Sequence, residues 1–306
     1  MDLEFFDDPA AFLAVAGAHL AEEPVVGTVV ATVAEREARE RLACPRYDGH
    51  RSAAAGATGP HWYVAARDAG TIVGVAMRTA PFEPYPLFLL PMPEAAALLL
   101  ARELHARAEA ITGANGALPA TRTFADETAR LTGGEVGVSM HTRLFELGQL
   151  TAPTPPPGRL RPVTEDEAGL ALDWFRAFHR DADEQAGRPP GDGHAETFFD
   201  LDDMLVRIHG ERVWFWDDGG PVHLTGANDP AYGVARIGPV YTPKELRGRG
   251  YAGAAVAEVS RRIVAAGARA CLFTDQANPT SNRLYETLGY RPVVDMANLR
   301  VATPGE

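Results

Sequence analysis

Short runs of alternating hydrophobic and polar residues, separated by segments with helical spacing, dominate the second half of the chain. Residues 212–227 alternate on both sides of an Asp-Asp-Gly-Gly turn, which is the signal of a β-hairpin. Thr164, followed three residues later by Glu167, forms a capping box that predicts a helix through 171–179. The remaining pattern predicts helices near 196–210 and over 251–266 and 279–288, and strands over 158–164, 233–241, 268–274 and 291–301.

The first half repeats this order of elements in a weaker form. Residues 61–77 again predict strand, turn and strand, and they precede a strand at 86–91, helices at 92–110 and 124–134, and a strand at 135–147. Residues 8–21 and 28–43 also have helical spacing. The repetition predicts a duplicated α+β unit, in which each copy is a mixed, largely antiparallel sheet flanked by helices.

A proline-rich segment at residues 151–158 separates the two copies. Its prolines lack an amide hydrogen and favour an extended connector. A chain of 306 residues is also long for one domain, since the usual expectation is about 150 residues per domain. We therefore expect a first domain at 1–150, a linker at 151–158 and a second domain at 159–306.

The composition narrows the classes of partner. The chain is 46% hydrophobic and has a formal net charge of −12, which opposes binding to nucleic acid or to an anionic membrane. Acidic residues precede the first apolar stretch, and no apolar run approaches the roughly 20 residues that cross a bilayer, so we expect a cytoplasmic protein. Cys44 and Cys271 stand in different halves and the histidines lack metal-ligand spacing, which predicts neither a disulfide nor a metal site. The sequence leaves both a monomer and a homodimer open.

Candidate chemistry begins at residues 247–254, Arg-Gly-Arg-Gly-Tyr-Ala-Gly-Ala, which lie between an extended run and a helical one. Glycines let backbone N–H groups converge on a ligand, and the following helix adds the positive end of its dipole, so the expected ligand is a phosphate or diphosphate. A glycine-rich connector with solvated arginines is the alternative.

A dinucleotide-binding fold is a second alternative. Gly248, Gly250 and Gly253 spell GxGxxG, and Asp275 ends the next predicted strand. In that fold the turn follows its strand almost directly, whereas residues 242–247 intervene here. Only one clear strand–helix unit and a final strand follow the turn, which also argues against a dinucleotide fold.

Two blocks of the second half resemble the GNAT superfamily of N-acetyltransferases, close to its FR47-like branch. The first is GPVYTPKELRGRGYA (238–252), in which Arg247, Gly250 and Ala252 fit the pattern of the family's phosphate loop. The second is LFTDQANPTSNRLYETLGYRPV (272–293), in which Asn278 is followed seven residues later by Tyr285. The resemblance covers residues 159–301 and extends to the first half only in the order of elements. It implies a tandem protein whose first copy is degenerate, because residues 92–97, which follow the corresponding strand, contain no glycine turn.

The resemblance implies acetyl-CoA as the cosubstrate. Its diphosphate would lie on the amides of the loop, and its pantetheine arm would pair with a strand that splays from its neighbour, as the flanking Pro239 and Pro243 suggest. Asn278 equally fits a helix N-cap, and Arg249 equally fits a solvated arginine. The residues implied in cofactor binding are Val240, Tyr241, Thr242, Arg247, Gly248, Arg249, Gly250, Tyr251, Ala252, Gly253, Asn278 and Ser281.

Tyr285 occupies the position in which the family has its proton donor for the departing thiolate. A phenol with a pKa of about 10 stays protonated at neutral pH and can protonate a thiolate that it contacts. The alternative is an aromatic of an amphipathic helix, packed with Leu284 and Leu288.

The general base and the acceptor are less defined by the sequence. Residues 233–241 contain no glutamate, although many family members carry one on that strand. The acids that could attract or deprotonate an amine are Asp181, Asp183, Glu184, Asp217 and Asp218. We expect transfer of acetyl to an amine of a small molecule or peptide. A non-catalytic acyl-CoA sensor or scaffold and an NAD-dependent oxidoreductase are the alternatives.

Overall fold

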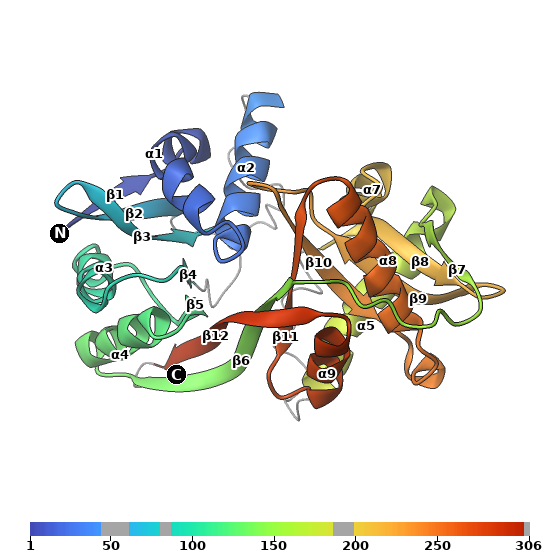
Figure 1. The fold of residues 1–306 in the computed structure, drawn as a ribbon. Coiled ribbons are helices and arrows are strands. Elements are labelled where there is room, and N and C mark those ends of the chain that lie inside the picture. Colours follow the sequence, from blue (N-terminus) through green and yellow to red (C-terminus); the bar gives the residue numbers. More distant parts are fainter. Residues whose placement is uncertain (44–60, 80–86, 186–198, 303–306) are drawn as a thin grey trace. The chain divides into compact units, whose positions relative to one another are not determined.

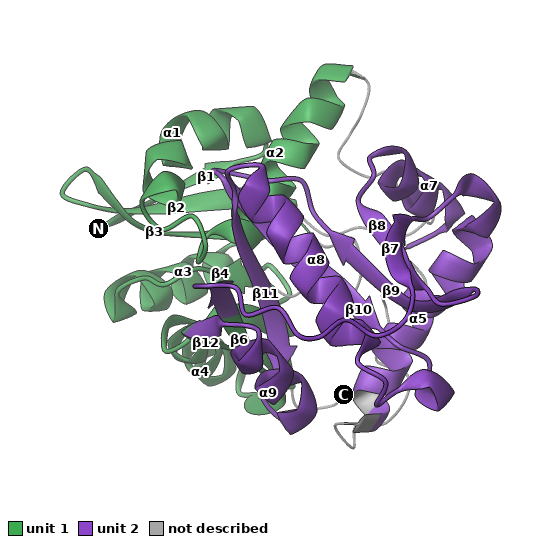
Figure 2. Ribbon diagram, turned by 45° about the vertical axis from the view of Figure 1, so that its right-hand side comes forward, with its two compact units in different colours: residues 1–144, 293–306 green, residues 145–292 purple. Residues whose placement is uncertain are grey.

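The computed structural model describes residues 1–43, 61–79, 87–185 and 199–302. Cys44 and part of the helix expected near 196–210 lie outside these ranges. The chain forms two compact units, residues 1–144 with 293–306 and residues 145–292 (Figure 2). The first unit therefore includes the C-terminal residues, which the sequence-based ranges place in the second domain.

The first unit is a sheet with helices on both faces (Figure 1). Helix α1 packs on β2 and β3, and Phe12 stacks on Tyr63 with ring centroids 4.7 Å apart. On the other face α3 and α4 cover a core that includes Leu100 and Phe124. The elements are β1 (Asp2–Phe6), α1 (Pro9–Glu22), α2 (Thr28–Ala43), β2 (Trp62–Asp68), β3 (Thr71–Arg78), β4 (Leu87–Leu89), α3 (Glu94–Ala106), β5 (Gly113–Ala117), α4 (Ala120–Thr132) and β6 (Glu135–Leu147).

The second unit has the same three-layer arrangement. Helix α8 packs on one face of its sheet, and α5 and α7 pack on the other. The capping box of Thr164 and Glu167 is present, at a short 3-10 turn that leads into α5. The elements are β7 (Arg159–Pro162), α5 (Ala168–Gln185), α7 (Leu201–His209), β8 (Val213–Asp217), β9 (Pro221–Ala227), β10 (Val234–Tyr241), α8 (Tyr251–Ala265), β11 (Arg269–Asp275) and α9 (Pro279–Thr287). Strand β12 (Tyr290–Ala302) follows, and its residues from Val293 onward belong to the first unit.

The pairing of strands is the same in the two halves. In the first half, β1 to β4 pair in sequence order as antiparallel neighbours, and β4 pairs with β5 in parallel. In the second, β7 to β10 pair antiparallel and β10 pairs with β11 in parallel. The predicted duplication of an α+β unit with mixed, largely antiparallel sheets is therefore confirmed.

The central strand of the second unit splays from its neighbour. Strands β10 and β11 pair from Val234↔Arg269 to Ile237↔Leu272, and β10 then continues to Tyr241 and β11 to Asp275. The β10–β9 register shifts between Ile237 and Val240, where Pro239 interrupts the strand. The splayed strand that the two prolines predicted is present, and its separated end opens the sheet at the candidate site.

Two strands of the first half differ from the sequence prediction. Strand β1 lies in a region that was assigned only helices, and β5 has the sequence Gly-Ala-Asn-Gly-Ala, which carries no strand signal. Gly116 of β5 requires φ 137°, and a Cβ there would lie 2.0 Å from the Leu89 carbonyl oxygen. Close approach of β4 and β5, rather than strand propensity, explains the small residues of this strand.

Candidate functional site

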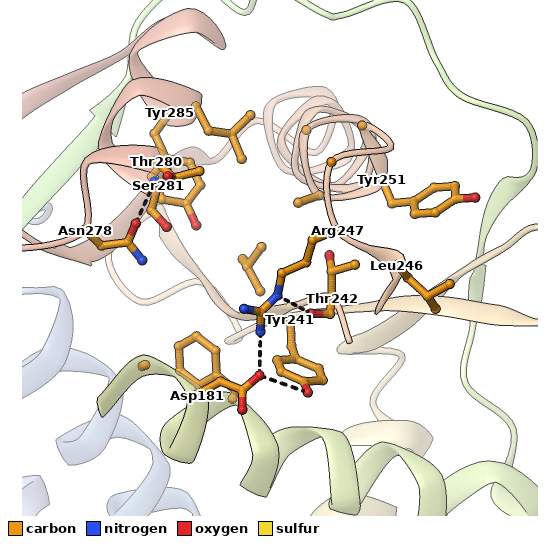
Figure 3. Close-up of a pocket in the computed structure, with 18 of the residues that line it drawn as sticks. Asp181, Tyr241, Thr242, Leu246, Arg247, Tyr251, Asn278, Thr280, Ser281 and Tyr285 are labelled. Atoms are coloured by element: carbon orange, nitrogen blue, oxygen red, sulfur yellow. Dashed lines mark hydrogen bonds and ion pairs between the residues drawn. The ribbon is translucent and has the colours of Figure 1, made fainter. Parts of the chain in front are cut away.

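A cavity of about 590 Å³ lies in the second unit at the splayed end of β10. Its walls come from the ends of α5 and β10, the glycine loop, the first turn of α8, and α9 (Figure 3). Tyr285 and each residue that the resemblance implied in cofactor binding line this cavity: Val240, Tyr241, Thr242, Arg247, Gly248, Arg249, Gly250, Tyr251, Ala252, Gly253, Asn278 and Ser281. The fold therefore brings together residues that are up to 45 positions apart in sequence, from Val240 to Tyr285.

The glycines of the loop serve two different purposes. Gly248 and Gly250 have φ of 78° and 87°, and a Cβ at either would meet nothing within 4 Å. They are therefore required by backbone conformation, since the left-handed region is strained for other residues. Gly253 lies inside α8, and a Cβ there would lie 3.2 Å from Leu284 Cδ1, so this glycine permits close packing of α8 and α9.

The amides of the loop point to an anion. Among the described residues, the N–H groups of 248–253 have no hydrogen-bond acceptor, and the first amide of the helix that is bonded is Ala254, which donates to the Gly250 carbonyl at 3.1 Å. Gly250 is the N-cap of α8 and supplies no capping side chain. Unpaired amides and the positive end of a 15-residue helix together favour a phosphate or carboxylate ligand.

The two arginines of the loop have different surroundings. Arg247 donates from Nε to the Thr242 carbonyl at 2.9 Å and from Nη2 to the Asp181 carboxylate, as Figure 3 shows. Its guanidinium thus holds the loop against β10 and α5. Arg249 is exposed and makes a weak contact with the Glu245 carbonyl at 3.4 Å.

Asp181 is the centre of this network. Besides Arg247, it accepts a hydrogen bond from the Tyr241 hydroxyl at 3.3 Å and lies 3.5 Å from Lys244 Nζ. Lys244 also pairs with Glu184 on the next turn of α5. Burial, together with the nearby Asp181 carboxylate, raises the pKa of Tyr241 above its usual value. The network joins the end of α5 to the end of β10 beside the cavity.

Tyr285 is both a core residue and a wall of the cavity. Its side chain is 6% exposed, its ring lies 6.1 Å from that of Tyr290, and its neighbour Leu288 is buried. The described residues give its hydroxyl no hydrogen-bond partner. Burial raises the pKa of Tyr285 well above the usual value for a phenol, so the hydroxyl holds its proton throughout the physiological range.

Asn278 and Ser281 line the cavity at the start of α9. Asn278 is the N-cap of that helix, and its Oδ1 accepts a hydrogen bond from the Ser281 amide at 3.1 Å. The N-cap interpretation of Asn278 is therefore realised in the structure, and both residues remain at the cavity wall (Figure 3).

The candidate acids differ in position. Asp217 accepts from Arg161 Nε at 2.7 Å and from the Gly220 amide at 3.1 Å, and Asp218 accepts from the Tyr251 hydroxyl at 2.7 Å. Glu184 is exposed and paired with Lys244, and the side chain of Asp183 lies outside the described residues. Of the four acids whose side chains the structure describes, Asp181 is the one that lines this cavity.

Sequence reasoning did not identify several residues at the site. Most are apolar or small neighbours of the identified motifs, and they are Leu246, Ala277, Pro279, Thr280 and Leu284. His223 on β9 was also missed: it is fully buried behind the cavity and hydrogen-bonded to Thr242. The sequence does place His223 in the predicted hairpin, beside the strand that precedes the glycine loop. A lone histidine in a strand, however, does not indicate which residue it contacts.

The described residues form neither a cluster of metal ligands nor a helix that could span a membrane. No group of three or more metal-ligating side chains gathers among these residues. Within the same ranges, none of the helices has the length and apolar character that crossing a membrane requires. Cys271 is buried and is not part of a disulfide.

Comparison with known proteins identifies a family model that matches part of the chain and solved structures that share its fold. Residues 229–301 match the family model described as FR47-like protein, and this segment contains the glycine loop and Tyr285. No curated protein matches the chain in sequence. A tandem GNAT protein from the clavulanic acid biosynthesis pathway has the same fold, with 15% identity and a TM-score of 0.51 over 100% of this chain and 99% of that one.

Two further solved structures show the same fold over nearly the whole chain. A GCN5-related N-acetyltransferase from Sphaerobacter thermophilus is 18% identical, with a TM-score of 0.54 over 99% of this chain and 97% of that one. A protein from Drosophila is 14% identical, with a TM-score of 0.61 over 98% of both chains. The dinucleotide-binding fold that the GxGxxG spacing left open is thus not the fold of this protein. The chain has the fold of tandem GNAT proteins, and its residues 229–301 match the family model of FR47-like proteins.

Proposed function

We propose that the second unit binds acetyl-CoA and transfers its acetyl group to an amine of a small molecule or peptide. The observation that carries the proposal is the row of amides at 248–253 without acceptors, which opens on the same cavity as the protonated Tyr285. A cavity of about 590 Å³ is also within the range of small-molecule and cofactor sites.

The residues of the site fit the cofactor in their donor chemistry. The loop amides would hold the diphosphate, since they combine unpaired donors with the helix dipole. The backbone of Val240–Thr242, free of β11 beyond Ile237, would pair with the amides of the pantetheine arm. Asn278 and Ser281 stand at the opposite wall, where α9 begins.

Bound acetyl-CoA supplies an acyl group activated as a thioester and a thiol leaving group. Tyr285 contributes a proton held on its hydroxyl oxygen, within an apolar surrounding that excludes water. Asp181 adds a carboxylate to the α5 side of the cavity, where it orients Arg247. Direct transfer of this kind depends mainly on positioning of the two reactants.

Only the second unit is proposed to bind the cofactor. In the first unit, residues 90–93 connect β4 to α3, and Pro93 caps that helix without a side-chain hydrogen bond. This connection contains neither a glycine loop nor an arginine, so it offers no equivalent cradle for a diphosphate.

Calorimetry with CoA and acetyl-CoA tests the binding, and release of free thiol in the presence of an amine panel tests the turnover. The panel contains aminoglycosides, polyamines, amino acids and peptide N-termini. We expect heat with both cofactor forms and thiol release with at least one amine. Binding without thiol release for any amine favours an acyl-CoA sensor, whereas no heat with either form rejects the proposal altogether.

Two matched glycine variants distinguish a specific effect on ligand binding from a general effect of backbone strain. Gly250→Ala and Gly267→Ala each place a side chain at positive φ, 87° and 81°, with open space around it, but they lie at opposite ends of α8. Both are expected to destabilise the fold by about 1 kcal/mol. Only Gly250→Ala should weaken CoA binding, by about tenfold or more, because it shifts the amides of the loop. Equal losses in both variants would contradict the assignment of the loop.

A further inference from the structure

His223 is a fully buried residue to which the proposed reaction assigns no role. It lies on β9 with both ring nitrogens engaged: Nδ1 is 2.7 Å from the Thr242 hydroxyl and Nε2 is 2.5 Å from the Thr225 hydroxyl. Thr225 is also fully buried, whereas Thr242 is partly exposed at the cavity wall. The three side chains form a chain of hydrogen bonds from the interior of the sheet to the cavity.

The register of β9 and β10 places this chain on the α8 side of the sheet. Val240 pairs with Thr225 and Tyr241 with Leu224, so Thr242 follows opposite His223. Alternation along the strands puts Val240 and Thr242 on one face and Tyr241 on the other. Val240 packs in the apolar cluster that contains Tyr251 of α8, whereas Tyr241 packs in the apolar cluster that includes residues of α5. The Thr242 hydroxyl therefore belongs to the face that carries the glycine loop.

The charge state of His223 follows from its surroundings. The ring is fully buried and its two contacts are neutral hydroxyls, so no carboxylate compensates a positive charge. Burial lowers the pKa of His223 to about 3. At neutral pH the ring consequently has one N–H donor and one nitrogen lone pair.

Hydrogen-bond accounting selects between the two neutral tautomers. In the described residues, His223 is the one hydrogen-bond partner of each threonine hydroxyl. If Nε2 carried the hydrogen, Thr225 would accept it, and its own hydroxyl hydrogen would be buried without an acceptor. If Nδ1 carries the hydrogen, Thr225 donates to Nε2 and Nδ1 donates to Thr242, which leaves no buried donor unpaired. Buried unpaired donors are rare because they lose their bond to water, so the Nδ1–H form is favoured.

We propose that His223 is a positioning residue that makes the Thr242 hydroxyl a hydrogen-bond donor into the cavity, toward an acceptor oxygen of the ligand held by the glycine loop. The Thr242 oxygen receives the Nδ1–H, so its own hydrogen is directed to the open side, where the cavity lies. Such a donor binds a phosphate or amide carbonyl oxygen and repels an ammonium group. The inference rests on the proposed binding of CoA for the identity of the ligand, but the tautomer of His223 does not depend on any ligand.

The tautomer is tested on the free wild-type protein by nitrogen-15 NMR of labelled histidine rings. The two ring nitrogens have distinct shifts when protonated and unprotonated, and the spectrum of His223→Asn assigns the His223 signals. We expect a protonated Nδ1 and an unprotonated Nε2. A protonated Nε2 overturns the proposal, whether or not the protein binds CoA.

The consequence for binding is tested by calorimetry with CoA. Thr242→Val removes the donor and should weaken binding about tenfold, while Thr242→Ser retains it. His223→Leu should cause a similar loss, and His223→Asn should restore most of it because its side-chain amide can replace Nδ1–H. The double variant His223→Leu/Thr242→Val should bind no more weakly than Thr242→Val alone, since His223 acts through Thr242. Additive losses, or no rescue by asparagine, overturn the proposal.

The source of the acceptor oxygen is identified with ADP as a second probe. ADP carries the diphosphate of CoA without the amide arm. If Thr242→Val weakens ADP and CoA equally, the hydroxyl binds a phosphate oxygen, and if it weakens CoA alone, the hydroxyl binds a carbonyl of the arm. If the wild-type protein gives no binding heat with CoA, the proposed function is refuted. If the wild type binds CoA and only the variants bind it more weakly, the donor role of Thr242 is supported.

Discussion

Tyr285 shows how one side chain of α9 combines packing and chemistry. Its ring fills the core beside Tyr290, and the same burial raises the pKa of its hydroxyl, so that the group enters the cavity as a protonated donor. An exposed phenol in the same place would exchange its proton with water. The apolar packing of α9 therefore keeps the hydroxyl protonated, which the proposed acid role requires.

Replacement of Tyr285 by phenylalanine separates these two contributions. We expect Tyr285→Phe to lower kcat by about 100-fold or more while CoA affinity and stability remain nearly unchanged, because the ring stays and the hydroxyl proton is lost. Tyr290→Phe is the matched control: it removes a buried hydroxyl that is hydrogen-bonded to Ser260 at 2.7 Å, away from the cavity. It should reduce stability and leave kcat unchanged. Thiol-release kinetics and thermal unfolding of both variants give the answer, and similar kcat losses in both would contradict an acid role for Tyr285.

His223 predicts a pH dependence of stability. The unfolded histidine protonates near 6.5, whereas the folded one resists protonation down to about 3. Between these values the unfolded state binds a proton that the folded state does not, so stability is full above pH 6.5 and decreases as the pH falls. The slope from this one group is about 1.4 kcal/mol per pH unit. Denaturant unfolding between pH 6.5 and 5 should show this slope in the wild type and its loss in His223→Asn; equal slopes would show that His223 is not buried neutral.

The residues of the site were predictable from the sequence to the extent that backbone conformation demands them. Gly248 and Gly250 could be identified because positive φ is a local requirement. The side chain of Arg247 was not predictable in the same way, because its partner Asp181 lies 66 positions away on α5. The link from Thr242 to His223 was missed for a related reason, since it depends on strand register.

At the scale of elements, the start of α5 depends on a cluster of local and long-range contacts. Glu167 accepts hydrogen bonds from the Thr164 amide and hydroxyl, and Arg161 Nη1 and Nη2 donate to its carboxylate at 2.7 and 2.6 Å. Arg161 also donates to Asp217 of β8, so the cluster fastens the helix start to the sheet. The hydrogen bonds from Arg161 lower the pKa of Glu167 to about 2.

We expect Glu167→Gln to destabilise the protein by about 2 kcal/mol at neutral pH, because it removes a cap and half of an ion pair. A carboxyl with a lowered folded pKa stabilises above its unfolded value of 4.5, and this contribution is lost as the pH falls from 4.5 toward 2. The difference between wild type and variant should therefore shrink in that window. Asp166→Asn in the same exposed turn is the control and should change stability by less than about 0.5 kcal/mol. A constant difference at all pH values would contradict the role of the ionised carboxylate.

The elements were predictable where a local pattern determines them. Amphipathic α5 follows from its helical spacing, and the β8–β9 hairpin follows from two extended runs joined by a glycine turn. Strand β5 was not predictable, because its small residues are selected by the backbone of β4 and by β12, which pairs with it from far along the chain. A local sequence pattern contains no information about neighbours that lie so far along the chain.

At the scale of the whole molecule, the two halves exchange their last strands. Residues Met296–Arg300 of β12 pair with β5 of the first unit, and the last residues of β6 belong to the second unit, where β6 is the neighbour of β11. Ala297 and Leu299 of β12 complete the apolar cluster of α4 with Ala125. Each half of the sequence therefore supplies a strand on which the core of the other unit depends.

Cleavage of the connector tests this dependence. With a protease site inserted at the exposed residues 153–155, the cleaved protein should elute as one species, because β12 still pairs with β5 and covers the α4 cluster. Its thermal unfolding should resemble that of the intact chain.

The same protein ended at Pro292 lacks the part of β12 that pairs with β5. We expect it to unfold at a lower temperature and, after cleavage, to separate or aggregate, since β5 becomes an unpaired edge above an open apolar face. A control chain ended at Ala302 keeps β12 whole and should behave as the full-length protein does. Size-exclusion chromatography of the three cleaved proteins distinguishes the outcomes: two stable, separate fragments from the full-length chain would show that the units fold independently of the exchanged strands.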